Sequence, residues 1–126
     1  MAKLILGGNE FPLVMTVGVL DDMAMRGYPV DKIPEFFRKE GQSIETDMDN
    51  GIEFILMTAR AGQAVAVARD GADPMSLPEL PAPELLRRLL TPGDVWGLCD
   101  DAIRHSLVRT VEAEPGKKTA AVTESP

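Results

Sequence analysis

The residue types best suited to covalent chemistry are represented by one cysteine, Cys99, and one histidine, His105. Six positions separate them, and six positions along a helix place two side chains on different faces. A thiolate–imidazole pair is therefore not expected, and the set is too small for the usual zinc sites. A lone cysteine forms no internal disulfide, which favours a reducing compartment.

Carboxylates are the other candidates for chemistry. Asp21-Asp22 and Asp100-Asp101 are adjacent on predicted helices, so their side chains diverge by roughly 100° and do not share a metal. The run 47–51 (Asp-Met-Asp-Asn-Gly) is similar to half of a calcium loop, but Thr58 stands at its twelfth position, where such a loop needs a glutamate. Gly7-Gly8 lacks the following helix of a phosphate cradle. No cofactor, metal or catalytic residue is expected, and enzyme function is disfavoured.

Composition limits the partners. The chain has 126 residues, of which 44% are hydrophobic, and this fits one globular domain. Its net charge of −7 repels phosphate backbones and anionic lipids. Nucleic acid and membrane are therefore not expected as partners. We identify no secretory signal and no apolar run of the roughly 20 residues that span a bilayer, and we expect a cytoplasmic protein.

The elements that would hold a site begin with a hairpin. Residues 3–6 and 10–16 form two apolar runs around Gly7-Gly8-Asn9, whose glycines suit a two-residue turn; Phe11, Leu13 and Met15 share one face. A hairpin is marginal alone, so this face must pack on helices.

Helices follow the hairpin. Thr16 predicts the N-cap of a helix that buries Val19, Leu20, Met23 and Ala24 and ends at Gly27. A short helix over 33–39, with Asp31 as its cap, carries Phe36 and Phe37 and stops at Gly41. A long helix over 47–68 buries Ile52, Ile55, Leu56 and Ala59.

The second half has a connector and two helices. Four prolines make 73–83 an extended connector, with a polyproline ligand as the alternative interpretation. Pro83 begins a helix over 84–90 with Leu85, Leu86, Leu89 and Leu90. Thr91-Pro92-Gly93-Asp94 predicts the next helix start, with Val95, Leu98, Cys99, Ala102, Ile103 and Ser106 on its buried stripe and its end near Val111.

These patterns predict an α+β, mostly α fold: an N-terminal β-hairpin packed on a bundle of about four to five helices. Residues 1–113 would form a single domain and 114–126 a flexible C-terminal tail. Large apolar side chains are the candidates for partner binding. Phe36, Phe37, Ile55 and Trp96 are either core residues or contacts to another protein, because aromatic residues are enriched in both settings.

The opening of the chain resembles tail assembly chaperones of long-tailed bacteriophages, prophages and gene transfer elements. The likeness rests on a strand, a glycine turn, a charged-aromatic pair, a second strand and a Gly-x-Leu helix start, here Gly8, Glu10-Phe11, Leu13, Gly18 and Leu20. Only the opening is motif-like; the likeness continues to about residue 111 as a layout of helices.

The resemblance implies a non-enzymatic chaperone of the host bacterial cytoplasm. Members bind the helical tape measure protein, help tail-tube protein polymerise around it, and are absent from the mature virion. Self-association and a longer product made by a frameshift near the C-terminus are also implied. The alternatives are a phage structural or head–tail adaptor protein and a small acidic regulatory protein.

Overall fold

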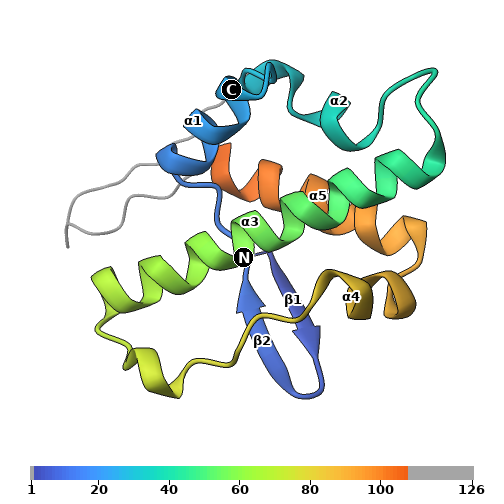
Figure 1. Ribbon diagram of the computed structural model, residues 1–126. Coiled ribbons are helices and arrows are strands. Elements are labelled where there is room, and N and C mark those ends of the chain that lie inside the picture. The colour runs from blue at the N-terminus through green and yellow to red at the C-terminus, as the bar shows by residue number, and fades with distance from the viewer. Residues whose placement is uncertain (1, 108–126) are drawn as a thin grey trace.

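The computed structural model describes residues 2–107, which contain two strands and five α-helices (Figure 1). Strand β1 (Lys3–Leu6) pairs with β2 (Asn9–Pro12). The helices are α1 (Val17–Met25), α2 (Pro34–Phe37), α3 (Ile44–Asp70), α4 (Pro83–Leu89) and α5 (Pro92–Leu107). The predicted α+β, mostly α class is confirmed. The predicted helix end near Val111 and the predicted tail at 114–126 lie outside the described residues.

The hairpin has the predicted tight turn. Its antiparallel register sets Leu6 opposite Asn9, so Gly7 and Gly8 alone make the turn, with φ of 56° and 83°. Two consecutive positive φ angles define a turn that glycine adopts without strain. The second strand ends at Pro12 and not at Thr16, but Phe11, Leu13 and Met15 are all buried, as predicted.

Helix α1 begins and ends as its sequence predicts. The Thr16 hydroxyl accepts a hydrogen bond from the Val19 N–H. At the other end Gly27 has a φ of 93°, and the Gly27 and Tyr28 N–H groups donate to the carbonyls of Ala24 and Met23. This is a Schellman ending. The predicted apolar stripe is narrower than expected, because Ala24 is exposed and Leu20 half-buried.

Helix α2 is shorter than predicted. It covers Pro34–Phe37, and Asp31 is not its cap, because that residue lies inside a 3₁₀ turn, Val30–Lys32. Arg38 leaves the helical region with φ −153° and ψ 80°. The last carbonyls of α2 are taken by distant side chains: Phe36 accepts from the Asn50 amide and Phe37 from the Trp96 indole N–H. The Arg38 guanidinium pairs with Asp100 of α5 at 3.0 Å.

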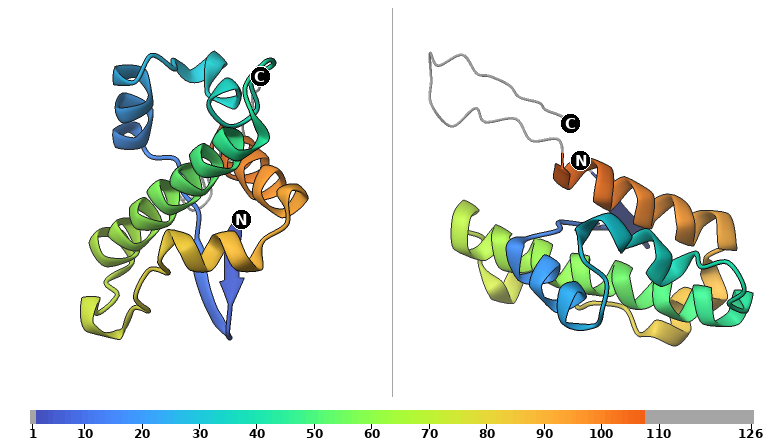
Figure 2. Two further views of the ribbon diagram at one scale, coloured as in Figure 1. Left: turned by 45° about the vertical axis from the view of Figure 1, so that its right-hand side comes forward. Right: turned by 90° about the horizontal axis from the view of Figure 1, so that it is seen from above.

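Helix α3 lies at the centre of the molecule and is longer than the predicted 47–68. Ser43 caps its first turn by accepting from the Thr46 N–H, and Gly71, at φ 73°, ends it. It contacts β2 and each of the other four α-helices, and Figure 2 shows it running between α1, α4 and α5. Ile52, Ile55, Leu56 and Ala59 are buried as predicted.

Helices α4 and α5 close the core. Pro83 is in the first turn of α4, but only Leu86 of its three leucines is buried; Leu85 and Leu89 are exposed, and Leu90, which follows the helix, is half-buried. At the start of α5 the Asp94 N–H donates to the Thr91 hydroxyl, and the Thr91 N–H donates to the Asp94 carboxylate. This capping box confirms the predicted helix start. Of the predicted stripe, Val95, Cys99 and Ala102 are buried, Leu98 and Ile103 are only half-buried, and the Ser106 side chain lies outside the described residues.

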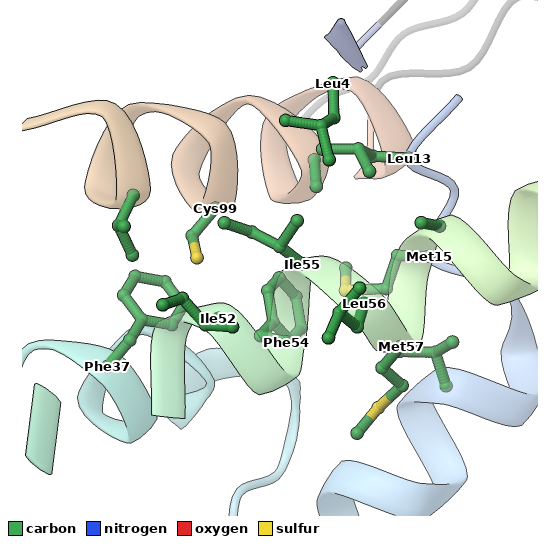
Figure 3. Packing of buried hydrophobic residues seen from close by; sticks show 14 of the residues in the cluster. Leu4, Leu13, Met15, Phe37, Ile52, Phe54, Ile55, Leu56, Met57 and Cys99 are labelled. Atoms are coloured by element: carbon green, nitrogen blue, oxygen red, sulfur yellow. The ribbon is translucent and has the colours of Figure 1, made fainter. Parts of the chain in front are cut away.

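The core lies between α3 and the elements around it. Figure 3 shows Cys99 of α5 directed toward α3 near Ile55, with Leu4 and Leu13 of the hairpin region packed farther along the same layer. By length and composition α3 could span a bilayer, although the sequence analysis identified no such run. Half of its most apolar stretch is buried inside the protein. The core helix of a globular domain has the same composition.

Candidate protein-binding groove

Cys99 is a buried core residue, and the side chain of His105 faces solvent. The Cys99 thiol is fully buried, and its Sγ lies 3.4 Å from the Gly51 carbonyl oxygen, as a donor. Burial raises the pKa of Cys99 far above its usual range, nearby Asp100 adds to the rise, and Arg38 opposes it. His105 is exposed, with Nδ1 3.1 Å from the Asp101 carbonyl oxygen. The thiol is therefore protonated and inaccessible.

The carboxylates are dispersed over the surface or paired. Within residues 2–107 no group of three or more histidine, cysteine or acidic side chains is placed to hold a metal ion. The calcium-loop-like segment 47–51 is helical, and Asp47 is buried, where its carboxylate accepts from the Gln42 side-chain amide at 2.6 Å. Asp100 and Asp101 pair with Arg38 and Arg104.

The four residues predicted as partner contacts are mostly core residues. Phe36, Phe37 and Ile55 are 6%, 0% and 0% exposed, so in this fold they lie in the core. Trp96 is half-buried. Its indole N–H donates to the Phe37 carbonyl at 2.7 Å, and the Arg38 guanidinium stacks on its ring at 5.3 Å. Trp96 thus ties α5 to α2 and offers only part of its surface.

A groove with a partly apolar floor runs along α3. It has a volume of about 370 Å³. Positions one turn apart on α3 form its base: Asp49, Ile52, Glu53, Leu56, Met57 and Arg60. Arg26, which caps α1, forms one wall, and Pro83 and Arg87 of α4 form the other. We call this the α3 groove. The helices α1 and α4 lie on opposite sides of α3 in Figure 1.

Charge is arranged in pairs across the α3 groove. Arg26 Nη1 lies 2.5 Å from Glu53 Oε2, and Arg87 pairs with Asp49. The third arginine, Arg60, is exposed and has no carboxylate partner among residues 2–107. Three cations against two anions make the groove locally positive on a chain whose net charge is −7.

The sequence contained a signal for this groove that the core assignment did not use. Ile52 and Leu56 belong to the predicted buried stripe, but Asp49, Glu53 and Arg60 recur on the same side at helical spacing. An apolar stripe that is flanked by charged residues lies at the edge of the core, where it borders solvent. Which elements flank it depends on the path of the connector, and spacing along one helix does not encode that path.

Comparisons with known proteins found no matching family model, no matching curated protein and no matching solved structure.

Proposed function

We propose that this protein is a tail assembly chaperone of a long-tailed bacteriophage or related element, which binds the helical tape measure protein before the tail tube forms around it. The observation that carries the proposal is the α3 groove, an apolar strip between charged walls. An amphipathic helix presents the complementary surface, with apolar side chains in a row and polar ones on both sides.

The opening of the chain supports the same proposal. The residues that resemble the chaperone family have defined structural roles here: Gly8 completes the hairpin turn, Phe11 and Leu13 seat the hairpin on the core, and Gly18 and Leu20 lie in the first turns of α1. The residues that carry the resemblance therefore all lie in one continuous structural unit, the hairpin and the start of α1.

Such a groove would act by covering apolar surface of the client. The floor residues Leu56 and Met57 are each only 8% exposed, so one groove buries little area and binds one client segment weakly. A long client with repeated amphipathic segments gains avidity from several bound copies. Weak individual contacts also let copies leave when tail-tube protein replaces them, and they require no covalent step. Self-association along the client belongs to the same proposal.

Co-expression tests the proposal. The tape measure protein encoded near this gene is produced alone, with this protein, and with an unrelated acidic helical protein of similar size. We expect a larger soluble fraction and co-purification only with this protein. An unchanged soluble fraction overturns the proposal, and so does recovery of this protein from purified virions, which would instead identify a structural or adaptor protein.

A further inference from the structure

The α3 groove carries an inference about what its occupant contains, and this inference rests on the proposed function. We propose that the groove selects amphipathic helical segments that carry a carboxylate, and that Arg60 is the residue that binds it. Arg26 and Arg87 already contact carboxylates of α3 itself, whereas Arg60 has no such partner among residues 2–107. Among the lining arginines, Arg60 is the one whose guanidinium is available to a bound segment.

The position of Arg60 fixes the spacing of the motif. It lies one helical turn beyond Leu56, at the end of the apolar strip that begins at Ile52. One turn is about 5.4 Å along either helix axis. A segment that lies along α3 and places apolar side chains over Ile52 and Leu56 therefore brings a side chain one turn farther to Arg60. The expected motif is two apolar residues and an aspartate or glutamate, each separated by three or four positions.

Charge complementarity favours a carboxylate at that place. The neighbouring walls are neutralised as pairs, so the unpaired guanidinium dominates the local field. A guanidinium also binds a carboxylate through two parallel hydrogen bonds, which fixes the register of the segment. The net charge of −7 repels an acidic segment elsewhere on the surface, and this repulsion sharpens the preference for the groove.

Synthetic peptides test the inference on the full chain. One helical peptide of about 16 residues carries two leucines and a glutamate at the expected spacing, and a matched peptide carries glutamine in place of glutamate. Fluorescence anisotropy gives the Kd of each for the wild type, for Arg60→Gln, and for Arg69→Gln. Arg69 is also an exposed arginine of α3, and it does not line the groove.

We expect the wild type to bind the glutamate peptide about three- to fivefold more tightly than the glutamine peptide, as an exposed ion pair allows. Arg60→Gln should bring the ratio of the two Kd values to about one and leave the Kd of the glutamine peptide unchanged. Arg69→Gln should preserve the ratio. The ratio should fall between about 0.05 M and about 0.5 M salt.

Equal Kd values of the two peptides for the wild type overturn the inference. An equal loss of affinity for both peptides with Arg60→Gln also overturns it, because it would indicate that Arg60 has a packing role. Sedimentation without peptide supplies a further test: a change in oligomeric state with Arg60→Gln would make a second copy the occupant and also overturn it. These outcomes are separable from the proposed function. A client that the wild type keeps soluble, together with equal Kd values for the two peptides, supports the chaperone and rejects the role of Arg60.

Discussion

Gly62 of α3 lies against the carbonyl group of Pro12: a methyl group at position 62 would stand 2.1 Å from the Pro12 carbonyl oxygen and 2.9 Å from its carbon. Two residues farther along, the Val14 N–H donates to the Thr58 carbonyl of α3 at 3.0 Å. The end of the hairpin therefore rests directly on the helix backbone, and only glycine at position 62 permits this approach.

Gly62→Ala should destabilise the protein by at least about 3 kcal/mol, because backbone atoms cannot move aside as a flexible side chain does. Gly97→Ala is the matched control: it also lies in a helix, and no atom lies within 4 Å of an added methyl group. The control should gain about 0.5–1 kcal/mol from helix propensity. Urea denaturation of both variants measures the difference, and equal stabilities would contradict the close contact.

A second close contact joins α3 to α5. A methyl group at Gly51 would lie 2.5 Å from a Val95 methyl carbon, while its other neighbours stand at 3.5 Å or more. Gly51→Ala should cost about 1–3 kcal/mol in the wild type. In a Val95→Ala background the same change should be neutral or stabilising, because the obstructing methyl is gone. A double-mutant cycle in urea measures the coupling, and additive effects would place the two helices farther apart.

Phe37 is fully buried, with its ring 5.6 Å from that of Phe54. Phe37→Ala should cost about 3–5 kcal/mol through lost burial and the cavity left behind. Leu89→Ala removes an apolar side chain that is 55% exposed and should change stability by less than about 0.5 kcal/mol. Thermal and urea unfolding check both values. A small effect at Phe37 would restore the idea that this residue is a partner contact.

The Cys99 thiol makes stability fall at alkaline pH. Its pKa is raised by burial in the folded chain and returns to about 9 on unfolding. Above about pH 9 the unfolded state loses the Cys99 proton, whereas the native state keeps it. The contribution of Cys99 to the free energy of unfolding is therefore complete below about pH 9 and declines above it by about 1.4 kcal/mol per pH unit. Cys99→Ala should lack this component of the slope. Urea midpoints from pH 8 to about pH 10.5 compare the two.

Local signals explain which parts of the fold the sequence predicts. The glycine turn at residues 7 and 8, the Thr16 cap, the Gly27 ending and the Thr91–Asp94 capping box each depend on a few neighbouring residues, and all are confirmed. The hairpin and helix starts follow from them. Fold class could therefore be predicted without tertiary information.

Tertiary contacts explain the rest. The last carbonyls of α2 accept from Asn50 and Trp96, which are distant in sequence. The exposure of Leu85 and Leu89 depends on how α4 lies on α3. The candidate site shows the same limit: Phe36, Phe37 and Ile55 have the composition of an interface but are enclosed by elements remote in sequence. The α3 groove could not be predicted in this way, because its two walls come from the end of α1 and from α4, which are remote in sequence.

The connector between Gly71 and Ala82 lies against the last turns of α3, where the Pro78 carbonyl accepts from the Gln63 side-chain amide at 2.7 Å. Each part that it joins contributes to the interior: Phe37 and Ile55 before it, Leu86 and Val95 after it. Cleavage in the exposed turn Pro74–Ser76 would leave those complementary faces intact and remove only the advantage of a closed loop. The molecule is thus a natural candidate for fragment complementation, in which two separately produced pieces reassemble and report when they are brought together.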